Sequence, residues 1–127
     1  MASTVRTLRR IGALDKVLII GYPHTGKTTL SARLIRPVLH LDGYVEKYDS
    51  ERLAAEQAMK FFKQSQWVAE GCLGFRLLTK GLDPDLIVFC TKTIGHGKWE
   101  MLIPGQKTMW RRYLGDQDHQ VDIIYHG

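Results

Sequence analysis

The architecture of the chain is set by twelve residues, Val17-Leu18-Ile19-Ile20-Gly21-Tyr22-Pro23-His24-Thr25-Gly26-Lys27-Thr28. The first four are branched and apolar, which is typical of a strand buried on both faces of a parallel sheet. The next eight fit the pattern G-x-x-x-x-G-K-[ST] at every fixed position. A buried-strand pattern before this loop and a helix pattern after it are the context that the motif requires.

The motif suits a densely anionic ligand, because such a ligand needs many donors and little steric bulk. Gly21 and Gly26 let the backbone turn tightly and approach phosphates closely. The N–H groups of the loop and the positive end of the following helix then face the phosphate oxygens. Lys27 is placed to reach the outer phosphates, and the Thr28 hydroxyl to join the coordination of Mg²⁺. The predicted site for ATP or GTP comprises Gly21, Tyr22, Pro23, His24, Thr25, Gly26, Lys27, Thr28 and Thr29.

Strand and helix patterns alternate along the whole chain. Strands are predicted at 17–20, 38–41, 66–69, 86–90 and 121–125. Helices are predicted at 28–36, 50–63, 73–81 and 104–115. Gly81 is a natural left-handed cap for the third helix, and Pro104 can open the fourth. This alternation predicts an α/β fold with a parallel sheet of about five strands and helices on both faces.

The 127 residues, 44% hydrophobic and 24% charged, fit one globular domain over 1–127, with a basic arm at 1–14. The apolar runs are too short to cross a bilayer, so no membrane association is expected. Cys72 and Cys90 have neither a disulfide framework nor metal-binding spacing, which indicates reduced thiols and a cytoplasmic protein.

The formal net charge of +5 favours anionic partners, either a nucleotide or a nucleic acid. Arg6, Arg9 and Arg10 are the candidate contacts for a nucleic acid. A solvated basic arm is favoured instead, because no aromatic residues interleave with these charges.

Two acidic residues follow predicted strands. Asp42 comes after the strand that ends at Leu41, and Glu70 after the strand that ends at Ala69. In an open parallel sheet the ligand crevice lies at the carboxyl ends of the strands. Both acids are therefore candidate site residues, with a plain loop position as the alternative for each.

Together with the phosphate motif, His40-Leu41-Asp42-Gly43 and Trp67-Val68-Ala69-Glu70-Gly71 give the chain a family resemblance. From residue 17 to about 125 it resembles the small-molecule kinases of the P-loop class. These include nucleoside monophosphate kinases, shikimate kinase and short kinase-like proteins of bacteria and phages. The resemblance implies a three-layer P-loop NTPase fold.

The resemblance also implies roles for individual side chains. Asp42 matches an acid that contacts the phosphoryl acceptor. Glu70 matches an acid that supports Mg²⁺, here through water, or binds the acceptor. Arg76 is implied as an acceptor-binding residue, although its spacing from Glu70 is longer than usual. Arg111 and Arg112 fall where lid arginines close over the transferred phosphate, with solvent-facing helix charges as the alternative.

The expected function is therefore an ATP-dependent phosphotransferase that acts on a small acceptor such as a nucleoside or nucleotide. Lys27, Asp42, Arg111 and Arg112 would be its catalytic residues. Members of the resembled group continue past the last strand with an element that helps to hold the base, whereas two residues follow Tyr125 here. The alternative is a nucleotide-binding regulatory protein with little turnover, which acts through a protein partner or a second copy of the chain.

Overall fold

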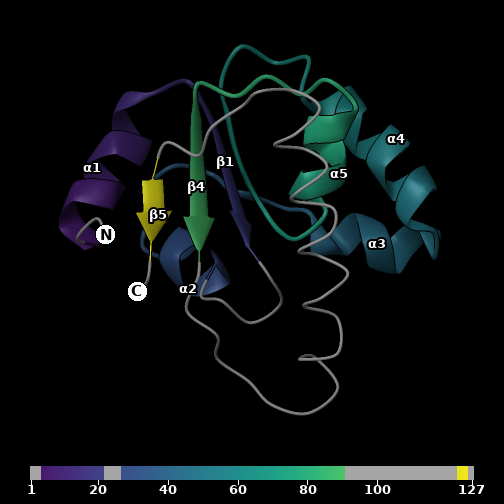
Figure 1. Cartoon of the computed structure of the whole chain (residues 1–127), viewed down its shortest axis with the longest axis horizontal. Helices are drawn as coiled ribbons and strands as arrows, with labels where there is room; N and C mark the ends of the chain where they lie inside the picture. The colour runs from purple at the N-terminus through teal and green to yellow at the C-terminus, as the bar shows by residue number, and fades with distance from the viewer. Residues whose placement is uncertain (1–3, 22–26, 91–122, 126–127) are drawn as a thin grey trace.

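A computed structural model of the chain describes residues 4–21, 27–90 and 123–125. Four strands form an all-parallel sheet in the order β2-β3-β1-β4, and a short β5 pairs in parallel with β4 at its edge (Figure 1). The α/β class and the parallel sheet are thus confirmed. The strands are β1 (Lys16–Gly21), β2 (Leu39–His40), β3 (Trp67–Glu70), β4 (Leu86–Cys90) and β5 (Ile123–Tyr125).

The alternation of side chains along β1 divides the core into two layers. Leu18 and Ile20 join one buried cluster, whereas Val17 and Ile19 join the other, and all four are fully buried. Because successive strand residues point to opposite faces, this pattern requires cover on both sides of the sheet. The continuous apolar run in the sequence has the same cause.

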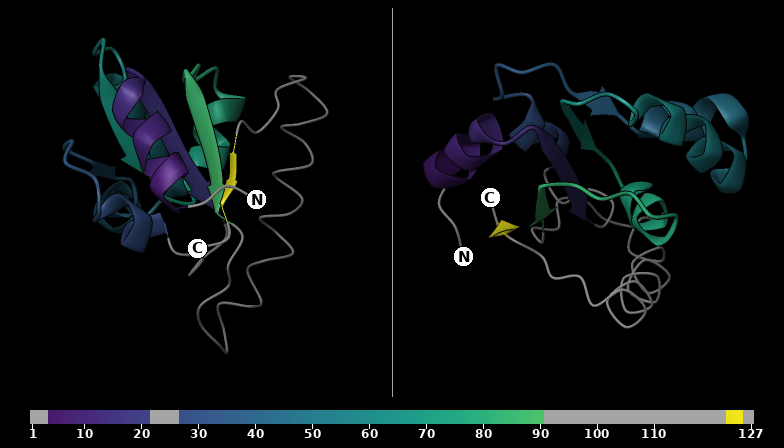
Figure 2. Two further views of the ribbon diagram at one scale, coloured as in Figure 1. Left: turned by 90° about the vertical axis from the view of Figure 1, so that its left-hand side faces the viewer. Right: turned by 90° about the horizontal axis from the view of Figure 1, so that it is seen from above.

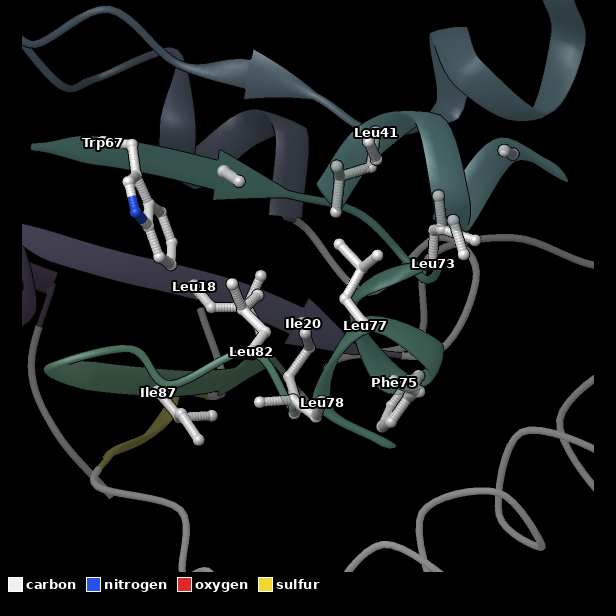
Figure 3. Close-up of a cluster of buried hydrophobic side chains, with 14 of the residues drawn as sticks. Leu18, Ile20, Leu41, Trp67, Leu73, Phe75, Leu77, Leu78, Leu82 and Ile87 are labelled. Carbon is white, nitrogen blue, oxygen red and sulfur yellow. The ribbon is translucent and has the colours of Figure 1, made fainter. Parts of the chain in front are cut away.

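Helices supply that cover on both faces (Figure 2). On one face, α1 (Thr4–Ala13) and α2 (Lys27–Ser31) contribute Ile11 and Leu30 to the cluster around Val17 and Ile19. On the other face, α4 (Glu51–Phe61) and α5 (Gly74–Thr79) pack against Leu18 and Ile20. Figure 3 shows Leu18 and Ile20 of β1 beside the leucines of α5.

Local signals fix the ends of two helices. The Ser50 hydroxyl accepts a hydrogen bond from the Leu53 N–H at 3.3 Å and so caps α4. At the end of α5, Gly81 has a φ of 98°, and its N–H donates to the Leu78 carbonyl at 3.2 Å. The Leu82 N–H donates to the Leu77 carbonyl at 3.1 Å, which completes a Schellman motif. The predicted left-handed cap at Gly81 is confirmed.

One predicted helix is shorter in the structure, and one helix was not predicted. The helix expected at 28–36 is α2, which ends at Ser31. Beyond it, the N–H groups of Arg33 and Leu34 donate to the carbonyls of Leu30 and Ser31, so the chain continues in turns rather than in an α-helix. The helix without a prediction is α3 (Asp42–Tyr48), which begins one residue after Leu41.

The N-terminal segment is not the basic tail that its charge suggested, because residues 4–13 form α1. Thr7 and Ile11 are fully buried, and Arg6, Arg9 and Arg10 lie on the exposed side. The spacing of Thr7 and Ile11 by four residues is the helical signal that was missed. Within the described residues, no helix has the length and apolar character needed to span a membrane.

Arg36 fastens the end of α1 to the rest of the domain. Its guanidinium donates from Nη1 to the carbonyls of Ile11, at 2.9 Å, and Leu14, and from Nη2 to the Asp15 carbonyl at 2.8 Å. The last carbonyls of a helix have no partners within the helix, so a cation that satisfies several of them is stabilising. The segment before β1 is thereby tied to the segment before β2.

We expect Arg36→Ala to lower the free energy of unfolding by roughly 1–3 kcal/mol, because charge-assisted hydrogen bonds to three carbonyls are lost. Urea denaturation measures this effect. Arg33→Ala is the matched control, since Arg33 is exposed nearby on the same connection. Equal effects of the two substitutions would show that the guanidinium does not stabilise α1.

Gly74 sets how closely α5 approaches β1. A Cβ at this position would overlap the Ile20 side chain and lie 3.2 Å from Leu18 Cδ1. We expect Gly74→Ala to destabilise the domain by roughly 1–3 kcal/mol in urea denaturation, because the added methyl group overpacks the core. Gly43→Ala, in α3 with nothing within 4 Å of the added Cβ, should be neutral or stabilising. If Gly74→Ala left the free energy of unfolding as unchanged as Gly43→Ala does, the close approach of α5 to β1 would not depend on Gly74.

Candidate functional site

The carboxyl ends of the strands bring the candidate residues to one edge of the sheet. In the parallel ladders, Ile19 of β1 is opposite Glu70 of β3, and Gly21 is opposite Cys90 of β4. His40 of β2 is opposite Glu70 on the other side. Four neighbouring strands thus end within one or two residues of the same line. This is the edge where ligand sites form in open parallel sheets.

Lys27 is a buried lysine at this edge. It is the first residue of α2, and only 6% of its surface is exposed. It donates a side-chain hydrogen bond to Cys72, and its positive charge also acts on Cys90. Lysine is seldom buried to this extent, so its ammonium group needs favourable partners.

Glu70 is the acidic counterpart of Lys27 in the same cluster. It ends β3 and is 1% exposed, and its Oε1 lies 2.7 Å from Nδ1 of His40. Its negative charge acts on both of the thiols that Lys27 approaches. The structure therefore places an anion and a cation around the same two cysteines, beneath the surface of the strand-end edge.

Asp42 lies on the exposed side of this cluster. It begins α3, and its Oδ1 is 3.3 Å from the point where a Cβ on Gly71 would lie. Its charge, like that of Glu70, acts on the Cys72 thiol. Asp42 and Glu70, both predicted from their positions after strands, therefore lie on either side of the turn at Gly71. The sequence alone did not show that the two acids lie close together.

The turn after Glu70 requires glycine. Gly71 has a φ of 143°, and an added Cβ would lie 2.9 Å from the Leu41 Cβ. Both the conformation and the close approach exclude a side chain. Gly71 also donates its N–H to the Ile19 carbonyl at 3.1 Å, so the turn is held against β1. Gly71 thereby fixes where Glu70 and Cys72 lie relative to Lys27.

Several predicted residues are placed elsewhere or lie outside the described residues. Arg76 is in α5, and its Nε is 3.4 Å from Oε1 of Glu51 in α4, so its predicted role with the acceptor stays a prediction. Thr28 and Thr29 belong to α2, but their side chains are not described. Outside the described residues lie Tyr22, Pro23, His24, Thr25, Gly26, Arg111 and Arg112, together with the helix predicted at 104–115.

Three residues of the cluster received no role from the sequence: His40, Cys72 and Cys90. The two cysteines are free thiols, as predicted, but the motif lysine donates to Cys72 and its charge acts on Cys90. Their proximity to Lys27 can be inferred only when β3 and β4 are known to pair with β1. The position of His40 beside Glu70 likewise follows only from the pairing of β2 with β3.

The environment of the two thiols raises their pKa values. Burial is the main cause of the raised pKa of Cys72, opposed by the Lys27 charge and reinforced by Asp42 and, more weakly, Glu70. Burial likewise raises the pKa of Cys90 from 9.0 to about 12, with Lys27 again opposing the shift. Both groups are therefore neutral thiols at neutral pH. They give Lys27 a polarizable and uncharged surrounding.

The comparisons with known proteins assign no family to this chain. No protein-family model, curated protein or solved structure matches it. What the structure establishes is an α/β domain with an all-parallel sheet in the order β2-β3-β1-β4. Membership of the P-loop kinases stays a prediction from the sequence motifs.

The raised pKa of Cys90 predicts a loss of stability at alkaline pH. Above pH 9 the thiol ionises in the unfolded chain but stays protonated in the folded one until about pH 12, so the unfolded state gains stability in this range. Between pH 8 and 10.5 the wild-type protein should lose about 2 kcal/mol more unfolding free energy than Cys90→Ala. Urea denaturation at both pH values measures the difference. The same pH dependence in both proteins would show that Cys90 titrates normally.

Proposed function

We propose that this chain binds a magnesium–nucleoside triphosphate at the strand-end edge and transfers the terminal phosphoryl group to a small acceptor. The observation that carries the proposal is the buried Lys27, which is the lysine of the loop motif and whose charge acts on the same thiol as that of Glu70. A buried cation beside a buried carboxylate at the end of a parallel sheet is the charge pattern that a metal–phosphate ligand needs. The three-layer P-loop fold is part of this proposal.

The residues of the edge fit such a ligand chemically. Lys27 donates to a thiol, and a thiol is a weak hydrogen-bond acceptor. Exchanging that bond for one to a phosphate oxygen gives a stronger, charge-assisted interaction. Lys27 can therefore turn to the phosphates with little loss. The electrostatic interaction that Lys27 loses with the two thiols is small, because both thiols are neutral.

Each residue has a definite part in the proposed reaction. Lys27 stabilises the negative charge of the outer phosphates. Thr28 and Glu70 are the residues that would hold Mg²⁺, Thr28 by its hydroxyl and Glu70 by its carboxylate. Mg²⁺, when bound, neutralises charge on the phosphate oxygens. Asp42, on the exposed side, orients the acceptor, and Arg111 or Arg112 neutralises the transferred group.

In the reaction, a bond forms between an acceptor oxygen and the terminal phosphorus, while the bond from that phosphorus to the bridging oxygen breaks; when the acceptor is a hydroxyl, its proton passes to solvent. The nucleoside diphosphate leaves with the bridging oxygen. Catalysis in such a site rests on positioning and on electrostatic stabilisation rather than on covalent participation of the protein. Residues on rigid strand ends, such as Glu70, serve that purpose well.

We expect Lys27→Met to weaken binding of ATP or GTP with Mg²⁺ by about 10- to 100-fold, because a charge-assisted hydrogen bond to the phosphates is lost. Methionine nearly preserves the buried volume, so the fold should survive the substitution. Isothermal titration calorimetry measures the affinity. Lys63→Ala is the control, because Lys63 is an exposed lysine beyond the end of α4. If folded wild-type protein bound neither triphosphate, the proposed function would be wrong.

Turnover is measured separately with triphosphate labelled at the terminal phosphate and a set of small nucleoside, nucleotide and hydroxyl acceptors. Label should pass to an acceptor with the wild-type protein and not with Lys27→Met. Binding without any acceptor-dependent transfer would instead favour a nucleotide-binding regulatory protein.

A further inference from the structure

We propose that His40 is a positioning residue that holds the Glu70 carboxylate in its working orientation; this inference rests on the proposed function. His40 Nδ1 and Glu70 Oε1 are 2.7 Å apart, a short distance for a hydrogen bond. With Glu70 as a carboxylate, Oε1 can only accept, so His40 Nδ1 is the donor in this contact. Nε2 is then the ring nitrogen that does not contact Glu70.

The backbone places these two residues side by side. His40 and Glu70 are register partners in the parallel pairing of β2 and β3, after the pair Leu39 and Ala69. The Leu41 N–H donates to the Glu70 carbonyl at 2.9 Å, directly beyond the histidine. The contact is therefore built on a hydrogen-bonded ladder, not on a loop.

The two side chains differ sharply in exposure, and this difference indicates the role of His40. The Glu70 side chain is 2% exposed, whereas the His40 side chain is 55% exposed. His40 thus approaches the buried carboxylate from the solvent side, and the charges of Lys27 and Glu70 meet around the thiols further inside. His40 therefore contacts the buried Glu70 while its own side chain stays half-exposed.

A glutamate needs such a partner when its direction matters. Its side chain has three rotatable bonds, and burial alone does not select one orientation of the carboxylate. By engaging Oε1, His40 sets the direction of the second oxygen, Oε2. Partners of this kind, which orient a group that acts on a metal, strongly affect metal affinity when they are removed.

The test compares His40→Ala with His40→Asn. Asparagine carries an N–H donor about as far from its Cα as histidine Nδ1, whereas alanine has none. We expect His40→Ala to weaken binding of the magnesium–triphosphate about 10-fold and to leave metal-free triphosphate binding in EDTA unchanged. His40→Asn should restore most of the magnesium-dependent affinity. Calorimetry with and without Mg²⁺ measures both quantities, and urea denaturation confirms that each variant is folded.

The possible outcomes separate this inference from the proposed function. If wild-type protein binds triphosphate with a magnesium effect and His40→Ala keeps that effect within twofold, the positioning role is wrong and the proposed function stands. Equal losses in His40→Asn and His40→Ala would also overturn it, because the donor would then not matter. A wild-type protein without magnesium-dependent binding would overturn both proposals together.

Discussion

The structure depends on the parallel pairing of β1 with both of its neighbours. β1 is fully buried from Val17 to Ile20, so its position fixes both core layers at once. Because the pairing is parallel, every strand that joins it ends at the same edge. The ladder registers then determine which residues meet there. Glu70 and Cys90 are brought to the edge from strands that lie about 50 and 70 residues further along the chain.

The strand-end edge contains ionised groups in an interior that disfavours them. Lys27 and Glu70 are both almost completely buried, and each would be strongly destabilising without compensation. In the structure Glu70 contacts His40, Lys27 donates to the Cys72 thiol, and the charges of both residues act on Cys90. Two buried ionisable side chains at the carboxyl ends of parallel strands make this edge the candidate place for chemistry. Gly71 and Gly74 then hold the turn and α5 close to β1, so that the arrangement is not loose.

The sequence predicted the elements whose signals are local and strong. The branched run at 17–20 predicted β1, and Gly81 predicted the left-handed cap of α5, because both signals depend on the residues themselves. It failed where the stabilising contact is distant. Nothing beside Arg36 indicates that its guanidinium reaches Ile11, Leu14 and Asp15. The helix α1 also carries a local signal, the spacing of Thr7 and Ile11, but its arginines favoured a basic arm instead.

The same contrast applies to the candidate site. Lys27, Asp42 and Glu70 could be selected from a motif and from positions after strands. The contribution of His40, Cys72 and Cys90 required the order of the strands, because neighbours in a sheet need not be neighbours in sequence. Sequence patterns therefore found the charged residues of the cluster and missed the residues that surround them.

The anchoring by Arg36 ties β1 and α2 to the end of α1. Leu14 and Arg36 are 22 positions apart, and the guanidinium closes this stretch of chain into a non-covalent ring. β1 and α2 both lie within the ring, and both contribute to the core layer that includes Ile11 of α1. Closure of a ring reduces the number of conformations that the elements inside it can reach. A change at Arg36 therefore affects β1 and α2 together, although neither element contains this residue.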